Sequence, residues 1–309
     1  MLPLVETVEE LDDMVRDEAL LRPAVMDLCE RLGVAVKPLI RFIEGSLPVY
    51  SVGAAHVVKL FPAYEELDAR REEQVLSHVY GKLPVPTPQV YSAGAYKNGW
   101  SFVLMSRLPG ESLAKAWPRI PAAEQDRIVT EAGETLAALH ALNPAPLAGS
   151  VGPSEWGLFV DAQRTNAVEQ QREAGLSEPW LEQIPWFLSS VPLAAPARRV
   201  LLHTEFMSEH LTVDPDGWRL TGLFDFEPAM IGDPAYDFVG VALYISRGQP
   251  RLLKRFYEAY GRAPFDPHTL MAYTLLHVYS DLPTSLRRMP KPPEPTLDAL
   301  AKTWFGIDD

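Results

Sequence analysis

The feature that most constrains the fold of this chain is a change of pattern near residue 108. Up to that point, short runs of β-branched and aromatic residues such as HVVKLF and WSFVLMSRL are separated by turn residues, which is typical of strands. After the turn Pro109-Gly110, residues 122–142 follow the spacing of an amphipathic helix. The pattern predicts an α+β fold with a β-rich N-terminal lobe over 1–107 and a mainly helical C-terminal lobe over 108–309. A junction between lobes is a common place for a ligand.

The predicted N-terminal lobe contains two helical segments and several strands. Apolar residues recur at helical spacing over residues 5–34. The run LDARREEQVLSHVYG is a second helical pattern, and Gly81 with the prolines after it ends this helix. The strand-like runs are PLIRFI, PVYSVG, HVVKLF, QVYSAGAY and WSFVLMSRL. We therefore expect an antiparallel sheet with one key helix.

Composition excludes several classes of protein. A length of 309 residues is ample for two lobes, and no apolar run approaches the ~20 residues that cross a bilayer. The start, MLPLVETVEELDDM, is acidic where a secretory signal is basic and then apolar, so we expect a cytoplasmic protein without a membrane partner. Cys29 is the single cysteine, which excludes an intrachain disulfide and favours a packed thiol.

The charge balance bears on the partners. The net charge is −13, from 41 acidic and 28 basic residues. An acidic surface repels phosphate backbones, so we expect no nucleic-acid partner. The same charge suits a cationic small-molecule substrate, although solubility alone would also explain it.

Residues 203–238 are the most informative segment for chemistry. They read as strand, loop, strand, turn, strand and loop, with acidic residues at the ends of strands. Asp225 follows the apolar run LTGLF, where a carboxylate can reach a divalent cation without being buried unpaired. A turn aspartate that caps the next segment would fit this position as well.

The same segment resembles the aminoglycoside phosphotransferase family, whose members are related to protein kinases. In that family a loop His-x-Asp-x-x-x-x-Asn is followed by Asp-aromatic-acidic and then by Gly-Asp-Pro-x-x-Asp. The corresponding positions here are His203, Glu205, His210, Asp225-Phe226-Glu227, Gly232-Asp233-Pro234 and Asp237. The resemblance covers roughly residues 30–245, and the hygromycin-type phosphotransferases are the loosely closest group. It implies a bilobal, protein-kinase-like fold.

In the N-terminal lobe the resemblance implies a nucleotide site for ATP or GTP. Lys59 matches the lysine that holds the phosphates, and Glu72 matches the glutamate that pairs with it, with Glu73 as the neighbouring alternative. Ser46 falls in the phosphate-covering loop, where a plain hairpin turn is an equal alternative. The base would hydrogen-bond the backbone near Ser106 and Leu108.

In the C-terminal lobe the resemblance implies the catalytic groups. Asp225 would hold a magnesium or manganese ion, with help from His210. Glu227 would be a ligand to a second ion, and a solvent-facing carboxylate beside the site is an equal alternative. Glu205 would orient or deprotonate a hydroxyl group of the acceptor. The expected activity is that of a small-molecule kinase, and an aminoglycoside, hence antibiotic resistance, is one candidate for the substrate.

Two positions depart from the family pattern. Glu205 replaces the loop aspartate and is one methylene longer, which matters because attack geometry is sensitive to shifts of about 1 Å. His210 replaces the asparagine, and imidazole suits manganese or zinc better than magnesium. Three hypotheses follow: an active kinase, a catalytically degenerate kinase that binds a nucleotide or small molecule without transfer, and a protein with a transition-metal cluster of His203, Glu205, Glu209 and His210.

Supporting roles are expected for several further residues. Asp233 is predicted to support the catalytic loop through backbone hydrogen bonds, and Asp237 to cap a helix or brace a loop. His140 is predicted to be packed or capping rather than catalytic. Acidic candidates for contact with a cationic acceptor are Glu155, Asp161, Glu178, Glu182 and Asp281.

Overall fold

The computed structural model describes residues 2–193 and 195–307. By their contacts these residues form two compact units. Unit 1 comprises Met1–Pro109 and Gly222–Pro228, and unit 2 comprises Gly110–Thr221 and Ala229–Asp309. The five-stranded sheet lies in unit 1 and most helices lie in unit 2, so the predicted α+β class is confirmed.

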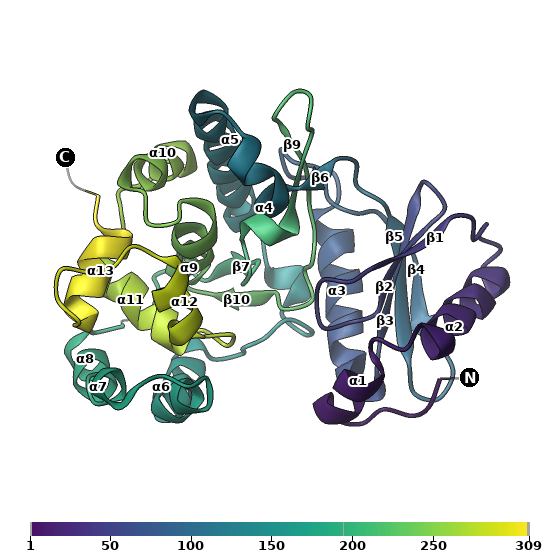
Figure 1. Cartoon of the computed structure of the whole chain (residues 1–309), viewed down its shortest axis with the longest axis horizontal. Helices are drawn as coiled ribbons and strands as arrows, with labels where there is room; N and C mark the ends of the chain where they lie inside the picture. Colours follow the sequence, from purple (N-terminus) through teal and green to yellow (C-terminus); the bar gives the residue numbers. More distant parts are fainter. Residues whose placement is uncertain (1, 194, 308–309) are drawn as a thin grey trace. The chain divides into compact units, whose positions relative to one another are not determined.

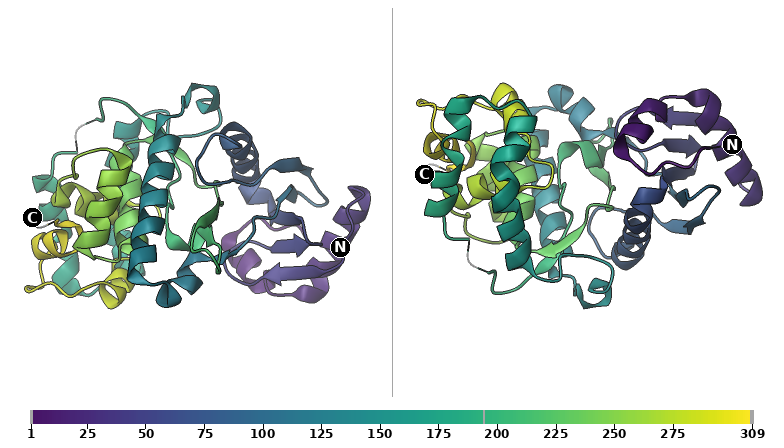
Figure 2. Two further views of the ribbon diagram at one scale, coloured as in Figure 1. Left: turned by 90° about the horizontal axis from the view of Figure 1, so that it is seen from above. Right: turned by 90° about the horizontal axis from the view of Figure 1, so that it is seen from below.

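Unit 1 is built on a five-stranded antiparallel sheet. Its elements are α1 (Val8–Met14), α2 (Glu18–Arg31), β1 (Leu39–Phe42), β2 (Val49–Val52), β3 (His56–Phe61), α3 (Glu66–Val79), β4 (Val90–Ala95) and β5 (Ser101–Ser106). The strand order is β1-β2-β3-β5-β4, which makes β3 the central strand. Helix α3 packs beside β4 and β5, whereas α1 and α2 lie on the other side of the sheet in Figures 1 and 2.

The N-terminal helical pattern is interrupted, contrary to the single segment expected over residues 5–34. Helix α1 ends at Met14, and Asp17 begins α2 by accepting hydrogen bonds from the backbone N–H groups of Ala19 and Leu20. An aspartate at this position satisfies amide donors that a continuous helix would bond to its own carbonyls, so it starts a new helix.

The segment Gly222–Pro228 belongs to unit 1 although its chain neighbours lie in unit 2. The backbone N–H of Leu223 donates to the carbonyl of Pro86 at 2.9 Å. Arg71 on α3 donates to the carbonyl of Glu227 at 2.8 Å. The sequence analysis placed this segment in the C-terminal lobe, and these contacts explain why it packs with the N-terminal unit.

Unit 2 is mainly helical. Its longer helices are α5 (Ala122–Ala141), α6 (Trp156–Glu173), α10 (Pro250–Tyr260), α11 (Pro267–Leu276) and α13 (Leu297–Phe305). Its shorter helices are α4 (Leu113–Ala116), α7 (Glu178–Leu181), α8 (Ile184–Ser190), α9 (Asp237–Gly240) and α12 (Leu282–Arg288), with a π-helical turn at Val241–Ile245.

Helices α5 and α10 make the most extensive helix pair in unit 2. Gly133 permits the close approach, because a Cβ there would lie 2.8 Å from both the Cβ of Ala259 and the carbonyl oxygen of Phe256. Both helices present apolar faces at helical spacing, which the sequence predicted for residues 122–142.

Short strands frame the loop that follows Leu202. Strand β7 (Val200–Leu202) pairs antiparallel with β10 (Met230–Gly232), and β8 (Leu211–Val213) pairs with β6 (Glu111–Ser112). Strand β9 (Leu220–Leu223) completes the order β6-β8-β9. The loop at 203–210 is therefore fixed at both ends by strands. Among the described residues, no helix is long and apolar enough to cross a membrane.

Candidate functional site

Lys59 lies at the centre of a buried ionic cluster in unit 1. Its Nζ is 3.0 Å from Glu72 Oε2, 2.5 Å from Asp225 Oδ1 and 2.5 Å from Glu227 Oε2. The lysine side chain is 7% exposed and the Glu72 side chain 1%. The expected pairing of Lys59 with Glu72 is present, and Glu227 is an additional partner of the lysine.

The elements explain this convergence. Lys59 lies on the central strand β3, and its cross-strand neighbours, Val49 on β2 and Val103 on β5, are apolar. Glu72 lies on the buried face of α3, whereas the adjacent Glu73 is rotated by one helical position and is partly exposed. The helical period thus selects Glu72 over Glu73.

Three carboxylates around one ammonium shift the pKa values of Lys59, Glu72 and Glu227. Burial opposes the charge of Lys59, but the carboxylates of Asp225, Glu227 and Glu72 outweigh it and raise its pKa. Burial raises the pKa of Glu72 and of Glu227; the lysine opposes this rise, and the other carboxylates add to it. The cluster holds more negative than positive charge, so it suits an added cation.

Asp225 has a left-handed backbone with φ of +73°. Aspartate tolerates this region better than most residues because its short side chain can bond locally. The turn directs the carboxylate to Lys59 directly after β9. This backbone agrees with the turn interpretation of Asp225, and its metal-ligand role stays a prediction.

The carboxylate oxygens of Glu72, Asp225 and Glu227 lie within 4.8 Å of one another. Oxygen donors of this kind suit Mg²⁺ and Mn²⁺. The oxygens of Asp225 and Glu227 suit the metal ion that the sequence predicts, whereas Glu72 is paired with Lys59, and all three carboxylates lie within unit 1.

The other predicted nucleotide-binding positions are also in unit 1. Ser46 is exposed in the loop between β1 and β2, beside Gly45 with φ of +92°. The N–H of Ser106 donates to the carbonyl of Gln89 at 2.8 Å, and its hydroxyl accepts from the Gln89 N–H at 2.9 Å. The Ser106 N–H is thus already used within the sheet, and the base-binding role expected of the backbone near Leu108, just past β5, stays a prediction.

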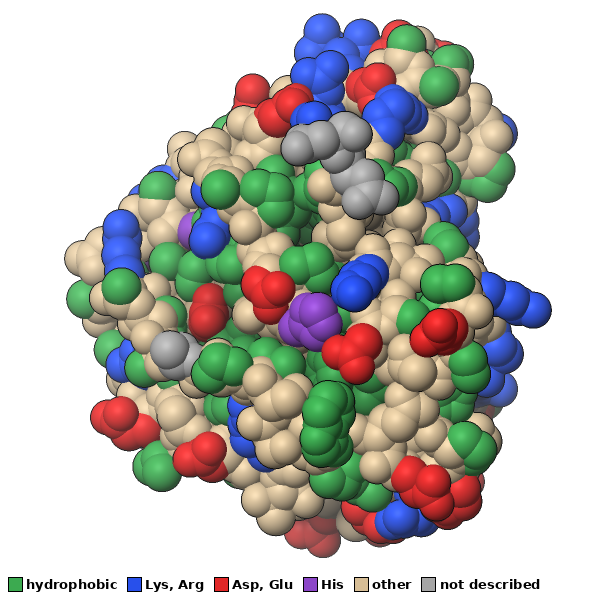
Figure 3. Space-filling view, turned by 90° about the vertical axis from the view of Figure 1, so that its left-hand side faces the viewer, with side chains coloured by type: hydrophobic (Ala, Val, Ile, Leu, Met, Phe, Trp, Pro, Cys, Tyr) green, Lys and Arg blue, Asp and Glu red, His purple; other side chains and the backbone are tan. Residues whose placement is uncertain are grey.

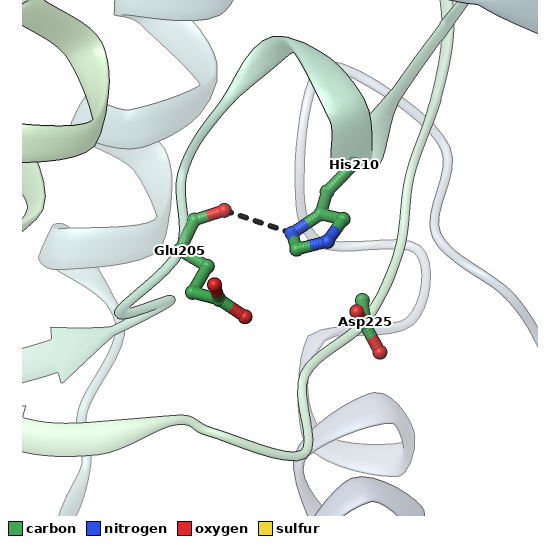
Figure 4. Close-up of side chains that lie close together, drawn as sticks. All are labelled: Glu205, His210 and Asp225. Carbon is green, nitrogen blue, oxygen red and sulfur yellow. Dashed lines mark hydrogen bonds between the residues drawn. The ribbon is translucent and has the colours of Figure 1, made fainter. Parts of the chain in front are cut away.

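In unit 2, Glu205 and His210 flank one short loop. The Nδ1 of His210 lies 3.0 Å from the backbone carbonyl of Glu205 (Figure 4). Because a carbonyl only accepts, Nδ1 carries the proton, and in the neutral ring Nε2 is then the basic nitrogen. A histidine oriented in this way can act as a metal ligand through Nε2.

Asp237 braces the start of this loop, as predicted for one of its two possible roles. Its carboxylate accepts hydrogen bonds from the N–H groups of His203 at 2.9 Å and Thr204 at 2.7 Å, and it contacts His140 Nε2 at 2.9 Å. His140 also contacts the Tyr260 hydroxyl and is 4% exposed. The packed role expected for His140 is confirmed.

The role predicted for Asp233 is wrong. Its carboxylate accepts from the N–H of Ala235 and from the hydroxyl of Tyr273, at 2.9 and 2.7 Å, and it is Asp237 that supports the loop. The 3₁₀ turn Pro234–Tyr236 separates the two aspartates and points them to different partners.

A cavity of about 40 Å³ lies beside Glu205 within unit 2. Glu205, Tyr244 and Asp281 line it, as does Thr204, whose buried Oγ1 has no hydrogen-bond partner among the described residues. Burial, and then the nearby carboxylate of Glu209, raise the pKa of Tyr244, so its hydroxyl is a neutral donor at this cavity. The arrangement offers carboxylates and hydroxyls to a small polar molecule.

Of the five acidic residues proposed for a cationic acceptor, Asp281 lines this cavity. The other four are exposed elsewhere on unit 2, and none of them lines it: Glu155, Asp161, Glu178 and Glu182. Figure 3 shows one face of the molecule, on which acidic and basic side chains are interspersed rather than gathered into a single acidic surface.

The predicted four-residue transition-metal cluster does not assemble. Among the described residues, neither His203 nor Glu209 belongs to a group of three or more possible ligands within 4.8 Å of one another. Glu209 instead accepts a hydrogen bond from the hydroxyl of Ser208. The third hypothesis therefore has no structural basis.

Comparison with known proteins decides the family. The family described as "Phosphotransferase enzyme family" matches residues 40–273, which is more than half of the chain. The chain belongs to this family. The match includes both the Lys59 cluster of unit 1 and the 203–210 loop of unit 2.

Curated relatives of this phosphotransferase-family chain are longer proteins. The chain is 25% identical over 205 residues to acyl-CoA dehydrogenase family member 11 of Mus musculus, covering 66% of this chain and 26% of that protein. The Homo sapiens counterpart is 25% identical over 187 residues, covering 60% and 24%. The chain thus spans about a quarter of the length of these relatives.

Solved structures show the fold. The GDP complex of wild-type aminoglycoside 2'-phosphotransferase-IIIa has a TM-score of 0.69 at 21% identity, covering 83% of this chain and 87% of that chain. The complex of the same type of enzyme with GDP and kanamycin has a TM-score of 0.69 at 19%, covering 85% and 93%. A hygromycin-type enzyme, APH(4)-Ia with ADP and hygromycin B, has a TM-score of 0.64 at 20%, covering 90% and 97%.

Proposed function

We propose that this chain transfers the terminal phosphoryl group of ATP or GTP to a hydroxyl group of a small molecule. The observation that carries the proposal is Lys59 held by Glu72 and Asp225, in a chain that belongs to a phosphotransferase family. A cationic acceptor such as an aminoglycoside is the first candidate, because fold relatives were solved with kanamycin and hygromycin B and the chain carries a net charge of −13.

In this proposal unit 1 is the nucleotide-binding lobe. The ammonium of Lys59 binds phosphate oxygens, and Glu72 fixes its position from α3. Ser46 contributes from the loop between β1 and β2, and the backbone at Leu108 bonds the base. A phosphate at Lys59 would add negative charge to a cluster in which carboxylates already outnumber the ammonium, so we expect nucleotide binding to need a metal ion.

Asp225 and Glu227 are the proposed metal ligands of unit 1, and His210 is the proposed ligand from unit 2. A bound Mg²⁺ or Mn²⁺ neutralises charge on the transferring phosphoryl group. Because His210 offers nitrogen rather than oxygen, we expect manganese to support nucleotide binding at least as well as magnesium.

Unit 2 is the proposed catalytic and acceptor-binding lobe. Glu205 accepts the proton of the acceptor hydroxyl while the oxygen of that hydroxyl forms a bond to the terminal phosphorus. The bond between that phosphorus and the β,γ-bridging oxygen breaks, and the nucleoside diphosphate leaves with the electron pair. The protein contributes mainly positioning and charge stabilisation, as is general for phosphoryl transfer.

A second candidate is a kinase-like protein that binds a nucleotide or small molecule without transfer. The observation that favours it is the pair of replacements at Glu205 and His210. In that case Glu205→Gln leaves nucleotide binding intact, and neither wild type nor variant releases a phosphorylated product.

The deciding experiment is a thermal-shift titration with ATP and GTP, each with magnesium and then manganese. A ligand of the folded state raises the melting temperature by mass action. We expect a metal-dependent shift in wild type and its loss in Asp225→Ala. Glu72→Gln should weaken the shift, whereas Glu73→Gln, the adjacent carboxylate on the partly exposed side of α3, should keep it.

Turnover separates the two candidates. Product is measured by phosphate transfer to kanamycin and hygromycin B and by phosphate release to water. A shift with turnover that Glu205→Gln removes supports the active kinase. A shift without turnover supports the binding-only protein, and no shift under any condition overturns the active kinase and leaves only a scaffold that binds some other small molecule.

A further inference from the structure

We propose that His277 is a positioning residue that sets the geometry of Glu205 through the backbone of Thr204. This inference rests on the proposed function of Glu205, and it concerns a histidine more than seventy residues away in the chain. His277 directly follows α11 and lines the same cavity as Glu205.

Thr204 has a backbone that needs external support. Its φ is +74°, a left-handed conformation that is unfavourable for a β-branched residue. Such a conformation persists only where the surroundings determine it. Its N–H donates to Asp237 Oδ1 at 2.7 Å, and its carbonyl lies 3.0 Å from His277 Nε2. Both peptide groups that flank Thr204 are therefore held, and Glu205 is the next residue.

The hydrogen bonds of His277 fix its tautomer. Nε2 must carry a proton to bond the carbonyl of Thr204, and Nδ1 accepts from the N–H of Tyr279 at 3.2 Å. The ring stacks on Tyr236 with a centroid distance of 4.6 Å and an interplanar angle of 16°. The imidazole is thus a neutral donor in one orientation, aimed at the loop.

The segment that carries His277 is itself anchored. Gln171 on α6 is fully buried; its amide donates to Ser280 and its carbonyl accepts from the N–H of Leu282. Gln170 lies 3.3 Å from the carbonyls of His277 and Ser280. A chain of hydrogen bonds therefore runs from α6 through the 277–282 segment to the loop that carries Glu205.

The test compares His277→Leu with His277→Gln. Leucine removes the donor, whereas the glutamine amide can place an N–H near the position of Nε2. We expect Leu to lower the turnover number for phosphate release from ATP or GTP by tenfold or more, since a misplacement of about 1 Å can cost ~100-fold. The KM for the nucleotide should change less than about twofold, since the proposed nucleotide groups lie in unit 1. Gln should restore most of the turnover.

Hydrogen exchange of backbone amides provides a readout that does not depend on activity. We expect His277→Leu to speed exchange in the peptide that contains residues 203–207, and His277→Gln to restore slow exchange. The control is His268→Leu near the start of α11, the helix that His277 follows; the His268 ring stacks on Phe187 and contacts Asp298 instead. It should change neither turnover nor exchange of this peptide.

Each outcome decides something. Equal behaviour of Leu and Gln, or unchanged exchange in both, overturns the positioning role. If wild type shows nucleotide binding but no turnover with any acceptor, the active-kinase proposal fails while the exchange data still decide on His277. A loss of the nucleotide-induced melting shift in both His277→Leu and His277→Gln would point to general misfolding and would count against a positioning role.

Discussion

At the scale of single residues, the free energy of unfolding should depend on the charges of Lys59 and the carboxylates around it. Lys59→Met leaves Glu72, which is 1% exposed, without its counter-ion. Removal of one partner of a buried pair costs about 3 kcal/mol or more in free energy of unfolding. We expect a loss of that size above about pH 8, measured by urea unfolding, and a smaller loss near pH 5, because burial raises the pKa of Glu72 to about 7 and the carboxyl then takes up a proton.

The matched control for Lys59 is Lys97→Met. Lys97 pairs with Asp27 at 2.9 Å, but the two side chains are 32% and 38% exposed. Such a pair contributes at most about 1 kcal/mol. Equal losses for Lys59→Met and Lys97→Met would contradict a buried, strongly coupled cluster.

His277 should make the protein sensitive to acid. Burial lowers its pKa from 6.5 to about 4, although the Thr204 carbonyl and the charge of Asp237 act in the opposite direction. The unfolded chain then binds the proton more readily than the folded protein. The stability that His277 contributes is therefore complete above pH 6.5 and is lost as the pH falls towards 4.

The size of that acid effect can be measured by difference. The pKa shift of His277 corresponds to a change in the free energy of unfolding on the order of 3 kcal/mol between neutral and acidic pH. His277→Gln does not titrate, so its free energy of unfolding should fall less than that of wild type between pH 7 and pH 4.5 in urea titrations. Parallel losses in the two proteins would show that His277 titrates normally.

Some residues of the site could be predicted from the sequence and some could not. The pairing of Lys59 with Glu72 followed from a strand, a helix and the spacing of a known motif. The exchange of roles between Asp233 and Asp237 could not be foreseen, because a 3₁₀ turn decides which carboxylate faces the loop. His277 carries no local signal, since its role depends on where α11 ends in space.

At the scale of elements, two glycines in helices should respond oppositely to the same substitution. Gly133→Ala on α5 places a Cβ 2.8 Å from the backbone oxygen of Phe256, which cannot yield easily. We expect a loss of roughly 1–3 kcal/mol from overpacking. Gly157→Ala on α6 meets nothing within 4 Å and should gain about 0.5 kcal/mol from reduced backbone entropy of the unfolded chain.

Urea unfolding of both glycine variants checks this prediction. Stabilisation by Gly133→Ala would mean that α5 and α10 can separate at low cost. Destabilisation by Gly157→Ala would mean that the first turn of α6 has no free space for the added Cβ, contrary to the distances around Gly157.

Most elements were predictable because their patterns are local. Alternating apolar runs gave the five strands of unit 1, and the long amphipathic run gave α5. The break between α1 and α2 was missed, because apolar spacing continues through it while a single capping residue, Asp17, redirects the hydrogen bonds. Apolar periodicity predicts which face of a helix is buried, but it does not show where a single capping residue ends one helix and starts the next.

At the scale of the whole molecule, unit 1 is not a continuous stretch of chain. Residues 222–228 supply Asp225 and Glu227 to Lys59, and Leu223 bonds Pro86. We expect residues 1–109 expressed alone to unfold at a lower temperature than the same fragment joined by a flexible linker to residues 222–228. Circular dichroism melts of the two fragments measure the difference.

The control for the joined fragment is Asp225→Ala within it, which should remove part of the gain. Fragments that melt together would show that the sheet and α3 are sufficient for the stability of unit 1. The sequence could not reveal this arrangement, because the assignment of a segment to a lobe depends on tertiary contacts rather than on its order in the chain.

The discontinuity of unit 1 also limits how such proteins can exchange parts by genetic recombination. A single crossover near residue 109 would join one parent's Lys59 and Glu72 to the other parent's Asp225 and Glu227. Functional chimeras between distant relatives should therefore need two further breakpoints, one on each side of residues 222–228, so that the heptapeptide is inherited together with the sheet it completes.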